Sequence, residues 1–212
     1  MTRGDPSLVL ILDDDPSIRA SVESLLRSVG QASRSFNSAR ALMAEGRPNI
    51  PSCLVLDVRL PGQSGLEFQR ELAASGIDLP IVFITGHGDV PMSVAAMKAG
   101  AIEFLTKPFR DQELLDAVHK GIALDAERRE ARTALRSMQE RFHSLTPRER
   151  EVMALVTSGQ INKQIAARLQ LSEITVKIHR SQMMRKMQAA SLPDLVRIAD
   201  RLGTMPPFDG TG

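Results

Sequence analysis

Residues 8–16 read LVLILDDDP, which is five apolar residues followed by three aspartates and a proline. An unbroken apolar run of this length is typical of a strand that is buried on both faces of a sheet. Asp15 followed by a proline is typical of a helix start, and apolar residues recur at helical spacing through residues 16–29. The stretch therefore predicts a buried strand that ends in acidic residues and leads into a helix.

The same succession of strand and helix repeats along the first half of the chain. Four further apolar segments are bounded by turn residues and separated by stretches with helical spacing. Because parallel strands need crossover connections that cover both faces of their sheet, five such units predict a doubly wound, parallel, five-stranded α/β sheet. We expect strands at 8–12, 32–36, 53–56, 81–84 and 103–105, and helices at 16–29, 38–45, 65–74 and 91–99.

The second half of the chain contains only helical patterns. A helix is expected from residue 111 to about 144, and within it a heptad seam predicts either a short coiled coil or a linker helix that packs on its own domain. Four helices are expected to follow, at 147–157, 162–169, 172–187 and 192–202, and residues 204–212 are expected to form a flexible tail. The seam consists of Ala131, Leu135, Met138, Phe142 and Leu145.

The length and the charge distribution indicate two domains with different tasks. At 212 residues the chain is about one and a half times as long as an ordinary domain. Residues 1–120 hold 12 Lys or Arg against 15 Asp or Glu, whereas residues 121–212 hold 15 against 10. A basic half suggests a polyanionic partner, although charge alone leaves a chance division of solvated residues open.

The composition excludes several classes of protein. There are seven Phe and no Trp or Tyr, so stacking on single-stranded bases is not expected to be the main mechanism. One cysteine, Cys53, excludes an intramolecular disulfide framework and a Cys-rich zinc site, and it fits a reducing cytosol. Neither a signal peptide nor a membrane span is recognised, so we expect a soluble, cytoplasmic protein.

Polar residues with distinct chemistry follow the predicted strands. Asp13, Asp14, Asp57, Thr85 and Lys107 fall at the carboxyl edge of the sheet, where open α/β sheets bind ligands. Three carboxylates brought together repel one another unless a cation neutralises them, and Mg²⁺ prefers such oxygen ligands. A carboxylate at 57 can attack a phosphoryl donor, with the lysine supplying counter-charge and the threonine hydroxyl a hydrogen bond. Each residue alone is weak evidence, since aspartates after strands often form turns, but together they predict a phosphoacceptor pocket.

The turn at residues 170–172 joins two predicted helices in a helix-turn-helix layout. Val176, Met183 and Met187 mark the expected buried stripe of the second helix. The opposite face suits a DNA major groove, because it combines apolar, polar and cationic side chains, and Ser172 is expected to cap the helix near a phosphate. A plain helical hairpin with a solvated face is the alternative. The opposite face comprises Ile174, Ile178, Ser181, Gln182 and Arg185, with Lys177 at its edge.

The first half resembles the receiver domain of two-component response regulators. The motifs that carry the resemblance are LDDDP at 12–16, LDVRLPG at 56–62, FITG at 83–86 and KPF at 107–109. It implies a flavodoxin-like fold and an aspartate, Asp57, that is phosphorylated by a sensor histidine kinase. It implies that Asp13, Asp14, Asp57 and the backbone carbonyl of Arg59 hold Mg²⁺, and that Thr85 and Phe104 form a switch pair. Many relatives carry Tyr where this chain has Phe104, which leaves a plain core role for Phe104 open.

The second half resembles the LuxR-type four-helix DNA-binding domain. The matching motifs are LTPREREV at 145–152, NKQIA at 162–166 and TVKIH at 175–179, and the loop TGHGDVPM at 85–92 is most similar to the FixJ branch. The resulting domain prediction is a receiver at 1–120, a linker helix at 121–144 and the DNA-binding domain at 145–203. DNA contacts are expected from Lys163, Ser172, Thr175, Lys177, Ile178, Arg180, Ser181, Arg185 and Lys186.

Together these features predict a transcription factor controlled by phosphorylation and not an enzyme in the ordinary sense. Its expected chemistry is limited to Mg²⁺-dependent autophosphorylation from a kinase phosphohistidine or a small phosphodonor. Expected partners are the sensor histidine kinase, double-stranded promoter DNA, RNA polymerase and a second copy after phosphorylation. A magnesium-dependent phosphatase is disfavoured, because Arg59 stands where such an enzyme needs a second carboxylate. A receiver-like protein that binds DNA constitutively is the remaining alternative.

Overall fold

A computed structural model describes residues 6–86 and 89–204. The chain divides into two compact units, residues 1–129 and 130–212, and the boundary lies inside the long helix α5 (Asp111–His143). The expected loop residues His87 and Gly88 and most of the expected tail lie outside the described residues. Within the described ranges no helix is long and apolar enough to span a membrane.

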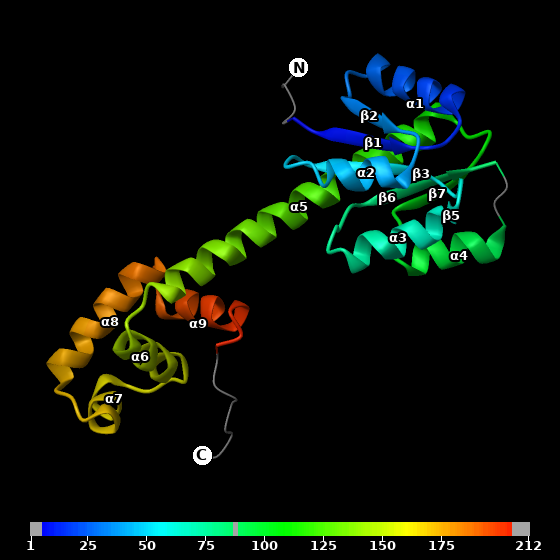
Figure 1. The fold of residues 1–212 in the computed structure, drawn as a ribbon. Helices are drawn as coiled ribbons and strands as arrows, with labels where there is room; N and C mark the ends of the chain where they lie inside the picture. Colours follow the sequence, from blue (N-terminus) through cyan, green and yellow to red (C-terminus); the bar gives the residue numbers. More distant parts are fainter. Residues whose placement is uncertain (1–5, 87–88, 205–212) are drawn as a thin grey trace. The chain divides into compact units, whose positions relative to one another are not determined.

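The first unit is built on a parallel five-stranded sheet (Figure 1). Its strand order is β2-β1-β3-β6-β7, the flavodoxin-like order, which confirms the predicted fold class. A two-stranded hairpin after β3 was not predicted, because two-residue strands are too short to show a periodic pattern. The strands are β1 (Leu8–Leu12), β2 (Ser33–Phe36), β3 (Ser52–Asp57), β6 (Ile81–Thr85) and β7 (Glu103–Thr106), and the hairpin is β4 (Arg59–Leu60) with β5 (Gln63–Ser64).

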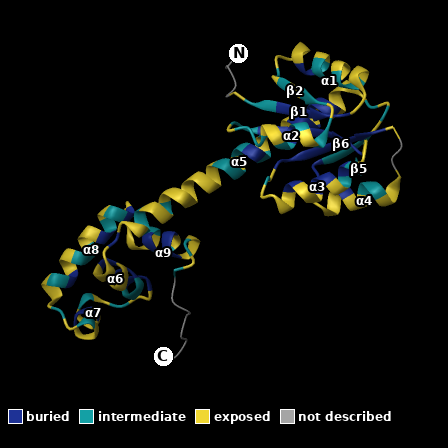
Figure 2. Ribbon diagram, viewed as in Figure 1, coloured by how far each residue is buried: buried dark blue, intermediate teal, exposed yellow. Residues whose placement is uncertain are grey.

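Helices cover both faces of this sheet, as the continuous apolar strands predicted. Alternate residues of each strand point to opposite faces, so the first unit has two hydrophobic clusters. One cluster lies under α1 and α5, and the other lies under α2, α3 and α4; Figure 2 shows the strands buried between these layers. The helices are α1 (Pro16–Ser28), α2 (Ala39–Glu45), α3 (Gly65–Ala74) and α4 (Val90–Lys98).

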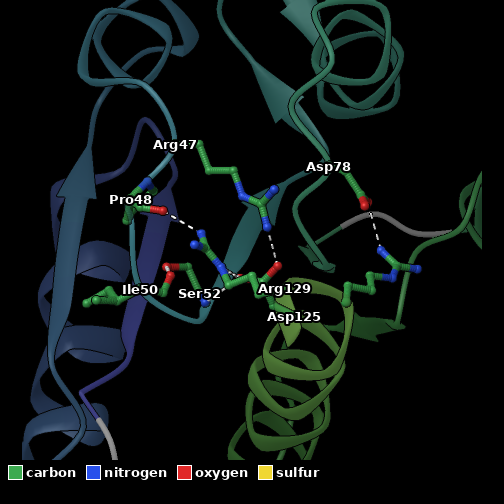
Figure 3. Close-up of polar contacts among 8 residues, drawn as sticks. Arg47, Pro48, Ile50, Ser52, Asp78, Asp125 and Arg129 are labelled. Carbon is green, nitrogen blue, oxygen red and sulfur yellow. Dashed lines mark hydrogen bonds and ion pairs between the residues drawn. The ribbon is translucent and has the colours of Figure 1, made fainter. Parts of the chain in front are cut away.

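Helix α5 is anchored to the first unit by a buried carboxylate, Asp125 (Figure 3). Its side chain accepts hydrogen bonds from the backbone nitrogen of Ser52 at 2.9 Å and from the Nε of Arg129 at 2.9 Å, and it also pairs with Arg47. Arg129 in turn donates to the carbonyl oxygen of Pro48. This cluster, the Asp125 anchor, ties α5 to the segment that leads into β3.

The second unit is a four-helix arrangement with its own core, as predicted. Its helices are α6 (Pro147–Thr157), α7 (Asn162–Leu169), α8 (Glu173–Met187) and α9 (Leu192–Arg201). Two members of the predicted heptad seam pack in this core, since Leu145 is buried and Phe142 lies against the cluster, whereas Leu135 is exposed. The last turns of α5 therefore pack on the unit that follows them, and the domain limits predicted at 120 and 144 stay predictions.

Candidate functional site

Three aspartates meet at the carboxyl ends of β1 and β3. One carboxylate oxygen from each of Asp13, Asp14 and Asp57 lies within 4.8 Å of the others. Asp13 and Asp57 are buried, and Asp14 is exposed. Adjacent parallel strands bring their carboxyl ends to the same edge, so residues 44 positions apart in sequence (57 minus 13) share one site. The grouping that the sequence predicted is present.

Lys107 bridges two of these carboxylates. Its Nζ lies 2.8 Å from Oδ2 of Asp13 and 3.2 Å from Oδ1 of Asp57. The remaining oxygen of Asp57, Oδ2, accepts a hydrogen bond from the backbone nitrogen of Arg59 at 2.9 Å. Asp57 is thus held by one cation and one amide, which fixes the orientation of its carboxyl group.

Burial and the charges in the pocket shift the pKa values of Asp57 and Lys107. Burial, the largest influence, raises the pKa of Asp57 above its ordinary value of 3.8; the Lys107 ammonium opposes that rise, and the Asp13 carboxylate adds to it. Burial by itself lowers the pKa of Lys107, but hydrogen bonds and charge from Asp13 and Asp57 outweigh it, so its pKa lies above the ordinary 10.5. Lys107 therefore stays charged, while the acidic cluster is only partly compensated by it.

The donor set fits a hard divalent cation. Carboxylate oxygens are the ligands that Mg²⁺ prefers, and three of them lie together here with one lysine to balance three negative charges. The carboxylate of Asp14 accepts no hydrogen bond from any residue in the described part of the chain, so its two oxygens are available to an ion. Arg59 contributes its amide to Asp57, and its side chain is exposed.

The predicted switch residues lie on the two strands beyond β3. Thr85 ends β6 and is fully buried, and β6 pairs directly with β3 through Asp57 and Ile84. Phe104 on β7 is half-buried, and its ring centroid lies 6.1 Å from that of Phe83. Phe104 thus packs with the hydrophobic cluster of that sheet face, and its switch role stays a prediction.

The second candidate site is the outer face of α8. Val176, Met183 and Met187 are fully buried, as predicted, and the opposite face is exposed. Ser172 caps the helix, because its side chain accepts a hydrogen bond from the backbone nitrogen of Thr175 at 3.1 Å. The exposed residues of the predicted contact set are Lys163, Ser172, Lys177, Ile178, Ser181 and Arg185.

The remaining predicted contact residues are partly engaged inside the unit. Lys186 Nζ lies 2.6 Å from a carboxylate oxygen of Glu149, whose side chain is buried. Arg180 donates to the side-chain oxygen of Asn162 at 3.0 Å, and the Thr175 hydroxyl lies 2.8 Å from that of Ser172. The charge of Lys186 is thus paired with Glu149, and its contact with a DNA phosphate stays a prediction.

Both regions match known protein families. Residues 9–119 match the response regulator receiver domain, and residues 143–199 match the bacterial regulatory proteins of the luxR family. The chain belongs to the FixJ-like response regulators. This confirms the family that the motifs indicated, and it places the acidic pocket in the receiver domain and α8 in the LuxR-type domain.

Relatives of this response regulator match it over nearly its whole length. It is 54% identical to nodulation protein W of Bradyrhizobium diazoefficiens over 197 residues, which cover 93% of this chain and 87% of the relative. It is 43% identical to the transcriptional regulatory protein FixJ of Azorhizobium caulinodans, with 96% of both chains covered. The response regulator StyR has a similar solved structure, with a TM-score of 0.85, 48% identity and coverage of 93% of this chain and 100% of StyR.

Sequence reasoning missed one residue of the receiver pocket. Arg19 lies in α1, and its Nη1 donates to the carbonyl oxygens of Asp13 and Asp14. Its position one turn into the helix that follows the acidic loop was the only signal, and helical periodicity marks it simply as a polar residue. Arg19 thus joins the residues that shape this response regulator's acidic pocket.

Proposed function

We propose that this response regulator is a transcription factor whose DNA binding is controlled by phosphorylation of Asp57. The observation that supports this most directly is the buried Asp57 carboxylate, which lies beside Asp13 and is held by Lys107 at 3.2 Å. The names of its relatives, transcriptional regulatory protein FixJ among them, fit a role in transcription. A sensor histidine kinase is the proposed phosphodonor, as receiver domains imply.

The proposed reaction is a displacement at phosphorus. An oxygen of Asp57 forms a bond to the phosphorus of the donor, and the bond from phosphorus to the histidine nitrogen, or to the acyl oxygen of a small donor, breaks. The leaving atom keeps that electron pair. Asp13, Asp14, Asp57 and the carbonyl of Arg59 would hold Mg²⁺, which when bound supplies positive charge to the phosphoryl oxygens.

The phosphorylated form is proposed to involve Asp57 itself and two residues that contact its phosphoryl group. Asp57 loses its own charge and gains a phosphoryl group that carries about two negative charges. Lys107 exchanges one of its carboxylate partners for this group, and the buried Thr85 hydroxyl donates to a phosphoryl oxygen. Movement of Thr85 with Phe104 is the proposed signal that changes the receiver surface, on which the chain forms a homodimer.

The output is proposed to be binding of promoter DNA through α8. Ser172 and Arg185 would contact phosphates, and Lys177, Ile178 and Ser181 would reach base edges in the major groove. Lys163, Thr175 and Arg180 complete the proposed interface. RNA polymerase is the further proposed partner, and the cytoplasm is the proposed location.

The test is phosphorylation of the full-length chain with acetyl phosphate and Mg²⁺, followed by intact mass and light scattering. We expect one added phosphoryl group, and the mass of a dimer in the phosphorylated sample alone. Asp57→Asn should remove the added group, whereas the exposed control Asp116→Asn should leave it unchanged. Full labelling of Asp57→Asn would show that another residue is the acceptor, and an unlabelled wild-type chain would favour constitutive DNA binding.

A further inference from the structure

Arg19 reaches from α1 back to the loop that carries the acidic residues. Its Nη1 lies 2.8 Å from the carbonyl oxygen of Asp13 and 3.0 Å from that of Asp14. These carbonyls lie just beyond β1, whose pairing with both neighbouring strands ends at Leu12. A single half-buried guanidinium thus binds two backbone groups that the sheet leaves outside its ladder.

The carboxylates of Asp13 and Asp14 depend to different degrees on the loop backbone for their position. Asp13 has side-chain contacts of its own, with Lys107 Nζ at 2.8 Å and the backbone nitrogen of Asp15 at 2.9 Å. Asp14 is exposed, and no described residue donates a hydrogen bond to its carboxylate. Only the backbone therefore fixes the position of Asp14, and Arg19 is the side chain that holds that backbone.

We infer that Arg19 is a positioning residue for the phosphoacceptor site, which keeps the Asp14 carboxylate beside those of Asp13 and Asp57. The inference rests on the proposed function, in which these carboxylates hold Mg²⁺. Residues that orient metal ligands without touching the ion typically change metal affinity by about 10–100-fold when they are replaced. Arg19 acts through Asp14 and makes no contact with the reacting atoms.

A purely electrostatic role for Arg19 predicts the opposite sign. Its positive charge lies at the loop that carries Asp13 and Asp14, so its removal would make the pocket more negative and would strengthen cation binding. Loss of positioning instead lets the loop move, and cation binding weakens. The direction of the change in affinity therefore separates the two roles.

The experiment is a calorimetric titration of the full-length chain with Mg²⁺, because the chain has no Trp or Tyr to report binding by fluorescence. We expect Arg19→Gln to weaken Mg²⁺ binding by about tenfold or more. Arg19→Lys keeps the charge and one donor group, and we expect it to lie between wild type and Arg19→Gln. Arg27→Gln, which removes an exposed arginine from the last turn of the same helix, is the matched control and should bind as wild type does.

A second measurement, the rate of labelling by acetyl phosphate, tests whether Arg19 acts only through Mg²⁺ affinity. At saturating Mg²⁺, labelling of Arg19→Gln by acetyl phosphate should return toward the wild-type rate, because the defect is in cation affinity and Asp57 itself is unchanged. Mg²⁺ binding by Arg19→Gln that is equal to or tighter than wild type would overturn the inference. If Arg19→Gln does not fold, wild-type affinity for Mg²⁺ in Arg19→Lys would overturn the inference, and an affinity weaker than wild type would support it. A wild-type chain that binds no Mg²⁺ would overturn the proposed site itself.

Discussion

At Gly121, α5 comes so close to β3 that no side chain fits between them. A methyl group at this position would lie 2.5 Å from Sγ of Cys53 and 3.2 Å from its Cβ. Both atoms belong to a fully buried residue in the middle of the sheet, so they have little room to move. The glycine is therefore required by packing, although it interrupts a helix of 33 residues.

Gly121→Ala should destabilise the receiver unit. Alanine improves helix propensity by about 1 kcal/mol, but overpacking of a filled core costs about 1–3 kcal/mol. Because the cost of overpacking exceeds the gain in helix propensity, we expect a lower free energy of unfolding. Urea denaturation followed by circular dichroism measures it. Cys53→Ala in the same chain removes the atom that clashes, so the double variant should lose less stability than the two single changes together. Additive losses would contradict the proposed contact.

Cys53 illustrates how burial changes a residue whose type alone suggests reactivity. Burial, aided by the charge of Asp125, raises the pKa of the Cys53 thiol to about 12. The thiolate, which is the reactive form, is therefore scarce at neutral pH. Cys53 is a packing residue in this protein, in agreement with its place in the predicted buried strand at 53–56.

At the scale of elements, α6 and α8 are joined by an ion pair between Glu149 and Lys186. The carboxylate of Glu149 also accepts a hydrogen bond from the backbone nitrogen of Thr146 at 2.8 Å, so it closes the capping box of α6. Burial by itself raises the pKa of Glu149, but the bonds from Lys186 and Thr146 outweigh it and hold that pKa below its ordinary value of 4.5. The carboxylate of Glu149 thus caps α6 and also binds α8.

The pH dependence of stability follows from the sign of that shift. A carboxyl group whose pKa is lowered by folding stabilises the fold fully above its ordinary value, and this contribution is lost as the pH falls through the folded value. Glu149→Gln should therefore lower the free energy of unfolding by about 1–3 kcal/mol at neutral pH. The difference from wild type should shrink below pH 4.5, as measured by calorimetric unfolding at several pH values.

Glu67 provides the matched control for this prediction. It also closes a capping box, at the start of α3, and hydrogen bonds from Ser64 lower its pKa. Glu67 is exposed and its capping box lacks a lysine like Lys186, so Glu67→Gln should change stability less than Glu149→Gln does. Equal effects of the two variants would show that the ion pair between α6 and α8 contributes nothing beyond the cap.

For the whole molecule, the structure distinguishes two neighbouring cations on α8. Arg185 is exposed, whereas Lys186 is paired with Glu149. Each phosphate contact releases counterions and adds about 0.9 to the slope of log affinity against log salt. Arg185→Ala should therefore reduce that slope by about one for every DNA sequence, whereas Lys186→Ala should leave the slope unchanged and lower thermal stability. Filter binding of the phosphorylated full-length chain at several salt concentrations measures both slopes.

The same titrations test which residues read the bases. Ile178→Ala and Ser181→Ala should each weaken binding to a specific duplex by about 1–3 kcal/mol if the side chain meets a base edge, with little change on a scrambled duplex. Unaltered affinity of both variants for the specific duplex would mean that this face of α8 does not enter the groove. A smaller salt slope in Lys186→Ala would show that Lys186 exchanges Glu149 for a phosphate when DNA binds.

The sequence alone determined the order of the five sheet strands and of the helices along the chain, the carboxylates and the lysine of the acidic pocket, and the exposed face of α8. These features follow from local periodicity and from the rule that parallel strands end at one edge, so a single pass along the chain reveals them. The pairing of individual polar side chains was decided only by the tertiary structure. Arg19 binds the acidic loop, Lys186 binds a glutamate 37 residues away, and Asp125 binds the backbone of Ser52, 73 residues away. Such contacts carry no periodic signal, because they depend on where the packed elements bring their surfaces together.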